Sequence, residues 1–304
     1  MAASSDLAGA VALKIDVDTY QGMKNGVPRL LGILKEFDAK ASFFLSWGPD
    51  KSGRAIFNIF KPGFLKKMFA TNAPGMYGFR TMLYGTLLPS PMIASGLPEV
   101  VKAVKDAGHE VAVHAWDHRT YQDKLARMTD AALADWLDRA FAAHKSMAGT
   151  EAKASGAPAW YADARVLADH DKRKLLYASD TRGQGPIYRP VLDGKEYATP
   201  QIPSNMTAIE EHLTLGVKAG DLLSAMTKEF SDGLNVLPVH AEVEGGPFAD
   251  LFRQMLNCVR KQKRQILTLE EAATKLLQGQ TPNCEVRMET YPGRSGMVLQ
   301  KVAT

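Results

Sequence analysis

The chain has 304 residues, of which 45% are hydrophobic and 23% are charged, as in ordinary globular proteins. This composition excludes a disordered or collagen-like chain, and no apolar run approaches the ~20 residues of a membrane span. The cysteines, Cys258 and Cys284, have no metal-binding spacing and suggest no disulfide framework, which favours a reducing compartment. Because residues 1–10 also lack the features of a secretory signal, we expect a cytoplasmic protein.

Charge is unevenly distributed along the chain. Although the net charge is only +4, residues 51–98 contain no Asp or Glu. The basic residues in this window are Lys51, Arg54, Lys61, Lys66, Lys67 and Arg80. They are mixed with Phe, Tyr, Met and Leu, a pattern that suits a surface lying on an anionic membrane. The alternative is a buried helical hairpin whose lysines reach solvent. No nucleic-acid recognition motif accompanies the charges, so nucleic acid is not an expected partner.

The first predicted elements are a strand, a helix and a second strand. Residues 11–17 (VALKIDV) have the apolar character of a buried strand. Residues 27–37 predict a helix, because Pro28 suits its first turn and leucines recur on one face. The second strand covers residues 41–46 (ASFFLS). This order within so short a span predicts parallel strand pairing.

The same alternation continues along the chain. A helix over residues 98–107 ends at Gly108, and a strand follows over residues 109–116. Thr129 has the character of an N-cap that begins another helix. Further strands are predicted over residues 175–179, 236–243 and 265–267, and further helices over residues 247–262 and 269–278.

These elements predict a single α/β domain with a barrel-like architecture over residues 1–280. Residues 48–97, which contain the basic window, form an insert in that domain. Residues 281–304 show no clear periodicity, and we expect them to form a C-terminal tail.

Three polar clusters lie at the ends of predicted strands: Asp16 and Asp18, His114 and His118, and His240 with Glu242. Active sites of parallel α/β folds gather at the carboxyl ends of the strands. His114 and His118 can face one point if the strand turns at His114, although a core histidine and a surface histidine would give the same spacing. Imidazole and carboxylate ligands suit a divalent cation such as Zn, Mn, Co or Ni.

The two aspartates have the spacing of residues on one face of a strand. Two ionised carboxylates in one pocket repel each other unless a cation is present. A cation ligated by one of them would leave the other available as a base. A strand-end turn in which an aspartate caps a helix is the alternative.

The motifs LKIDVDT (13–19), KASFFLS (40–46), HAWDH (114–118), SDTRG (179–183) and VLPVHAEVEG (236–245) resemble, in this order, those of the polysaccharide deacetylase family. This family is also called the NodB homology or carbohydrate esterase 4 family. The resemblance implies a distorted (β/α) barrel that carries the basic, apolar insert. Within the family the motifs are similar to those of members that remove a formyl group from formamido-arabinose linked to undecaprenyl phosphate, a step that feeds lipid A modification.

Site residues carry over from the motifs as follows. The resemblance implies that Asp16 is the catalytic base and that Asp18, His114 and His118 bind the metal. It also implies that His240 is the catalytic acid and that Asp180 orients it. Tyr161 stands where the family's third motif has an arginine beside the base. Arg165 or Arg182 would then fill that role, or the base is oriented differently.

The resemblance further implies a lipid-linked amino sugar as substrate and an anionic membrane surface as partner, on the inner face of the inner membrane. Glu242 would lie behind the metal ligands or meet the sugar amine; the alternative is an exposed strand residue without a role in the site. Two other functions fit the sequence: an N-deacetylase of another amino sugar, such as peptidoglycan or chitin, and a carbohydrate-binding barrel without catalysis. The five residues Asp16, Asp18, His114, His118 and His240 argue against the latter, because binding alone would not need all of them.

Overall fold

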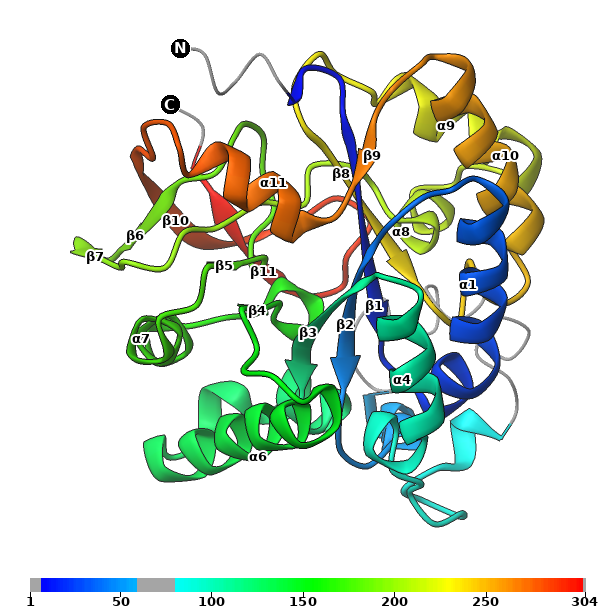
Figure 1. Cartoon of the computed structure of the whole chain (residues 1–304). Helices are drawn as coiled ribbons and strands as arrows, with labels where there is room; N and C mark the ends of the chain where they lie inside the picture. The colour runs from blue at the N-terminus through cyan, green and yellow to red at the C-terminus, as the bar shows by residue number, and fades with distance from the viewer. Residues whose placement is uncertain (1–6, 59–79, 303–304) are drawn as a thin grey trace.

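A computed structural model describes residues 7–58 and 80–302. Its centre is a parallel sheet with the order β5-β4-β3-β2-β1-β8, in which β9 also pairs with β1 (Figure 1). The strands are β1 Val11–Val17, β2 Ser42–Ser46, β3 Glu110–Ala115, β4 Ala154–Ser155, β5 Tyr177–Ala178, β8 Asn235–His240 and β9 Ile266–Leu267. The predicted strands are therefore confirmed, and the parallel pairing follows from the helices that connect them.

The sheet curls into a barrel that an irregular segment closes. Residues 200–206 lie between the edge strands β5 and β8. The amide of Ile202 donates to the carbonyl of Ala178, and the amide of Met206 donates to the carbonyl of Val236. The α/β class and the distorted (β/α) barrel predicted from the sequence are confirmed, with this segment replacing a regular closing strand.

Helices cover the outside of the barrel. Neighbouring helices α10, α1, α4 and α6 form a continuous layer against the apolar face of the sheet. Among the described residues no helix combines the length and apolarity that a membrane crossing requires. The helices are α1 Val27–Glu36, α4 Pro98–Asp106, α5 His118–Lys124, α6 Asp130–Ala148, α7 Ala164–Arg173, α8 Ile209–Thr214, α9 Leu222–Lys228, α10 Ala249–Lys261 and α11 Leu269–Leu276.

Strand β1 shows how the sequence divides the two sides of the sheet. Leu13, Ile15 and Val17 alternate along it and pack in the core cluster shared with the helices. Lys14 and Asp16 have the opposite parity and therefore face the barrel interior, as does Ala12. Every residue of β1 is buried, which is typical of a central parallel strand.

The sequence predicted a C-terminal tail over residues 281–304, but most of this segment is folded. It forms β10 Asn283–Thr290 and β11 Met297–Lys301, which join β6 Arg189–Leu192 and β7 Lys195–Glu196 in a second sheet (Figure 1). The amide of Arg182 donates to the carbonyl of Leu299, so β11 is fastened to the loop that follows β5. Polar and apolar residues alternate over Asn283–Thr290, the pattern of a half-exposed strand, which was not recognised in the sequence.

Candidate active site

Three side chains form a compact cluster at the carboxyl ends of β1 and β3. The ligand atoms of Asp18, His114 and His118 all lie within 4.8 Å of one another. Nε2 of His114 is 3.1 Å from Oδ1 of Asp18, and Nε2 of His118 is 3.2 Å from Oδ2. His118 is the first residue of α5, where Asp117 caps the helix by accepting from the amide of Thr120. The turn at this cap brings His118 back to His114.

The hydrogen bonds and burial of the two histidines favour a cation between them and Asp18. Nδ1 of His114 is 2.5 Å from the carbonyl oxygen of Gly156, which can only accept, so Nδ1 carries the proton. In the neutral imidazole Nε2 then presents a lone pair towards Asp18, and two acceptors face each other unless a cation lies between them. Burial lowers the pKa of His118 to about 4, so the His118 imidazole is neutral at physiological pH. Oδ1 of Asp18 is buried without a hydrogen-bond partner among the described residues.

Asp16 lies beside this cluster on β1 and pairs with a buried lysine. Nζ of Lys14 is 2.6 Å from Oδ1 and 2.5 Å from Oδ2 of Asp16. The side chain of Lys14 is fully buried, and that of Asp16 is 5% exposed, so solvent does not screen the pair. The sequence analysis missed Lys14. The available signal was a lysine in an otherwise apolar strand, two residues before Asp16 and therefore on the same face.

Lys14 contacts Asp16, the residue beside which the third motif of the family places an arginine. Arg165 binds Asp163 and the carbonyls of Leu125 and Met128, so it ties α7 to the turn after α5. Arg182 is fully buried against Glu211. Neither arginine contacts Asp16, so the other alternative holds: Asp16 is oriented differently, by its contact with Lys14.

His240, the last residue of β8, stands opposite Asp16 in the register of the two strands. Its Nδ1 is 3.1 Å from Oε1 of Glu210 on α8. The expectation that Asp180 orients His240 was wrong. Asp180 instead lies 3.2 Å from Nδ1 of His170 and accepts from the amide of Ala157, because the loop after β5 points towards α7.

Glu210 controls the charge of His240. Burial opposes the protonated imidazole, but the Glu210 carboxylate raises the pKa of His240 well above its usual value. Burial likewise opposes the Glu210 carboxylate, yet His240 lowers the pKa of Glu210 to about 2. The pair is therefore an imidazolium and a carboxylate at neutral pH. Glu210 could not be selected by sequence periodicity, since α8 is brought to β8 by the irregular closing segment.

Two more glutamates lie buried behind His240. The amide of His240 donates to Glu244, and burial raises the pKa of Glu244 to about 8. Burial and the nearby charge of Asp18 raise the pKa of Glu242 well above its usual value. A Cβ built on Gly22 would lie 2.3 Å from Oε2 of Glu242, so this carboxyl packs closely against the loop after β1.

The turn between β10 and β11 also reaches the site. Arg294 is 4.0 Å from Glu210 and 3.5 Å from Glu211, and its guanidinium lies 4.8 Å from the ring centre of Trp160. A Cβ on Gly293, where φ is +78°, would be 2.8 Å from the carbonyl oxygen of Glu211. The C-terminal strand pair is thus packed tightly against the start of α8, which holds the partner of His240.

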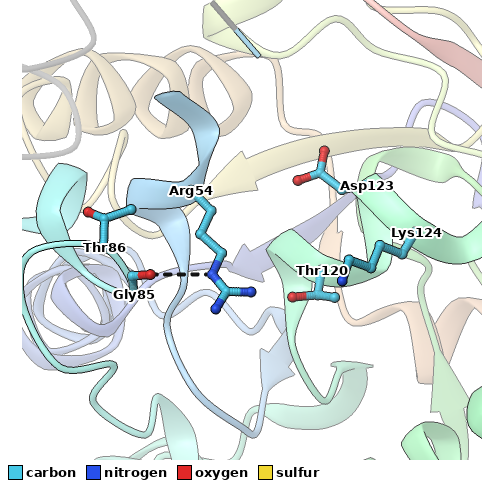
Figure 2. Close-up of a pocket in the computed structure, with 6 residues that line it drawn as sticks. All are labelled: Arg54, Gly85, Thr86, Thr120, Asp123 and Lys124. Carbon is cyan, nitrogen blue, oxygen red and sulfur yellow. Dashed lines mark hydrogen bonds between the residues drawn. The ribbon is translucent and has the colours of Figure 1, made fainter. Parts of the chain in front are cut away.

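A pocket opens between the insert and α5 (Figure 2). Its volume is about 510 Å³, within the range of small-molecule sites. It is lined by Arg54, Gly85, Thr86, Thr120, Asp123 and Lys124. Figure 2 shows the Arg54 guanidinium, whose Nε donates to the carbonyl of Gly85, pointing between the insert and α5. Thr120 and Lys124 belong to α5, the short helix that begins at His118.

A two-histidine, one-carboxylate cluster beside a buried carboxylate and an imidazolium is the arrangement of a hydrolase that works with a bound cation. The chain belongs to the polysaccharide deacetylase family, whose model matches residues 8–175. A probable 4-deoxy-4-formamido-L-arabinose-phosphoundecaprenol deformylase, ArnD of Shewanella sediminis, is 37% identical over 81% of this chain and 80% of its own length. The protein of the same name from Wigglesworthia glossinidia brevipalpis is 28% identical, with coverage of 91% and 97%.

Solved structures share the fold at low identity. The peptidoglycan deacetylase PdaC from Bacillus subtilis has a TM-score of 0.53 and 12% identity, covering 89% of this chain and 93% of its own. PuuE allantoinase has a TM-score of 0.61 and 14% identity, with coverage of 88% and 90%. At such identities the likeness supports the barrel architecture alone.

Proposed function

We propose that this protein hydrolyses the formamide of formamido-arabinose linked to undecaprenyl phosphate, releasing formate and a free sugar amine. The observation that carries the proposal is that the Asp16 carboxylate and the His240 imidazolium lie on paired strands beside the Asp18, His114 and His118 cluster. The substrate comes from the names of the two curated relatives, which share most of their length with this chain.

Asp18, His114 and His118 would hold one divalent cation. Such a cation supplies a Lewis acid that polarises an amide oxygen and makes water more acidic. Asp16 accepts the proton of the attacking water, and its carboxylate is held in place by Lys14. His240 donates a proton to the nitrogen as the C–N bond breaks, since an amide anion is too poor a leaving group to depart alone.

The substrate assignment is tested by following formate release from formamido-arabinose-phosphoundecaprenol, with the acetamido analogue as the matched comparison. We expect release of formate and a clear preference for the formyl compound. A preference for the acetyl compound would instead assign the protein to the N-deacetylases of amino sugars. Turnover of neither compound would contradict an amide hydrolase of this class.

Glu210→Gln is expected to move the alkaline limb of the pH–rate profile to lower pH. Glu210 raises the pKa of His240, so protonated His240 persists until the pH rises through that raised value. Without the carboxylate the proton is lost at lower pH, and the rate falls earlier. The measurement is kcat against pH, with Asp180→Asn as control. An unchanged profile in Glu210→Gln, or the same displacement in Asp180→Asn, would contradict the assignment.

We also propose that the protein works at an anionic membrane surface. Arg54 and Lys124 line the pocket beside α5, and Leu87, close to it in the insert, is 81% exposed. Lys61, Lys66 and Lys67, which carry much of the basic window, lie outside the described residues. Flotation with vesicles containing phosphatidylglycerol is expected to carry the protein upwards, less so at high salt. Equal flotation with neutral vesicles would contradict an electrostatic attachment.

A further inference from the structure

We propose that Lys14 is a positioning residue of the reaction, which orients the Asp16 carboxylate for proton transfer. The inference rests on the proposed function for the identity of the reaction, but the ion pair itself can be tested without any substrate. Lys14 is the second residue of the LKIDVDT motif, and its contacts in the barrel interior support a positioning role.

The first observation is that one ammonium group contacts both carboxylate oxygens. Nζ of Lys14 lies 2.6 Å from Oδ1 and 2.5 Å from Oδ2 of Asp16. Two short charge-assisted contacts restrict the rotation of the carboxylate about its last bond. Each oxygen retains a lone pair, so the group is oriented while its capacity to accept a proton is kept.

The second observation is that the surroundings select a cation at this position. The ammonium lies 4.8 Å from the ring centre of Phe44 and 5.3 Å from that of Trp160, both within range of a cation–π contact. Ala159 and Trp160 adopt left-handed φ values of 55° and 52°, which are uncommon for residues with side chains. Backbone strain is thus concentrated in the turn that presents the Trp160 ring to the lysine.

The third observation is that the chain leaves room for the lysine stem. A Cβ built on Gly156 would lie 2.8 Å from the Phe44 ring and 3.2 Å from Cε of Lys14. A side chain at this position would therefore displace one of them. The carbonyl of the same Gly156 accepts from His114, so one residue fixes the tautomer of a metal ligand and the space beside the base.

Stability alone does not explain the pair. A fully buried ion pair must offset the desolvation of both charges, and apolar side chains of similar volume often serve at least as well. Ala12, which shares the inward face of β1, packs in an apolar cluster with Phe44. An oriented carboxylate at the end of β1 gives the buried charges a function that apolar residues could not perform.

Kinetics with Lys14→Met and Lys14→Arg test the positioning role. We expect Lys14→Met to lower kcat by about 100-fold or more, the scale of general-base catalysis, with KM changed by less than about threefold. Lys14→Arg should recover at least about tenfold of this loss because it keeps the charge. The matched control is Arg173→Met, which removes another cation that packs on an aromatic ring, Phe141, but pairs with Asp138 and Asp169. Its kcat should stay within about threefold of the unmodified protein.

Thermal unfolding of Lys14→Met, Asp16→Asn and the double variant tests the pair without substrate. Each single variant leaves a buried charge or amide without its partner, so the double variant should lose less Tm than the sum of the two. Additive Tm losses, or a Lys14→Met enzyme with unchanged kcat, would overturn the proposal. If the unmodified protein hydrolysed no formamido sugar, the proposed function would fail while the unfolding measurements still decided whether Lys14 holds Asp16.

Discussion

Asp16→Asn is expected to reduce formate release to the background rate while the protein keeps its metal. An amide cannot accept the proton of the attacking water, and loss of a general base costs on the order of 10²–10⁴-fold. Asparagine has nearly the same shape as aspartate, so the three proposed ligands Asp18, His114 and His118 should stay in place. The expected result is full metal content with almost no turnover.

Two measurements decide this prediction: formate release and metal content by elemental analysis. Asp163→Asn is a matched control, because Asp163 caps α7 by accepting from the amides of Arg165 and Val166. That variant should lose no more than about 1 kcal/mol of stability and no turnover. Normal turnover in Asp16→Asn would remove Asp16 from the role of base, whereas loss of metal would show that it is a ligand.

His114→Ala is expected to lose both bound metal and activity. Nε2 of His114 faces Asp18 at 3.1 Å and its tautomer is fixed by Gly156, so the substitution removes an oriented ligand. Two remaining side chains would bind a divalent cation weakly, and activity should fall with occupancy. Calorimetric titration with Zn²⁺, Mn²⁺, Co²⁺ and Ni²⁺ measures the affinity of each metal and also ranks them.

His144→Ala supplies the control for this experiment. His144 is a buried histidine of α6, and its Nε2 contacts the carbonyl of Val111 at 2.9 Å. Its removal should lower stability, as loss of a buried hydrogen bond does, by about 1–3 kcal/mol, without changing metal affinity. Unchanged metal affinity in His114→Ala would exclude His114 as a ligand, whatever happened to its activity.

Hydrophobic periodicity predicted the central strands, and the polar residues at their ends predicted the position of the site. The buried strand over residues 11–17 was predicted with the bounds that β1 has in the structure. Because parallel strands end at the same edge of a sheet, the polar residues at the carboxyl ends of β1, β3 and β8 were predicted to lie close together. The structure brings Asp18, His114 and His118 together and places Asp16 and His240 on paired strands. Metal binding itself remains a prediction.

Glu210 and Arg294 were not predicted, because neither lies at the carboxyl end of a strand in the central sheet. Glu210 belongs to a short helix whose position depends on the irregular segment that closes the barrel, and no periodicity encodes such a closure. Arg294 lies in the turn of a strand pair whose exposed polar residues resembled a tail. Lys14, in contrast, could have been predicted from the sequence, because a residue two positions before Asp16 in a strand lies on the same face.

The central claim is that one cation, held by Asp18, His114 and His118, serves the hydrolysis of a sugar formamide. Its most direct test is formate release from formamido-arabinose-phosphoundecaprenol by protein stripped of metal and then reloaded. We predict no release from the stripped protein and full recovery at one equivalent of divalent cation per chain. Formate release at an undiminished rate from protein shown to contain no metal would contradict the claim.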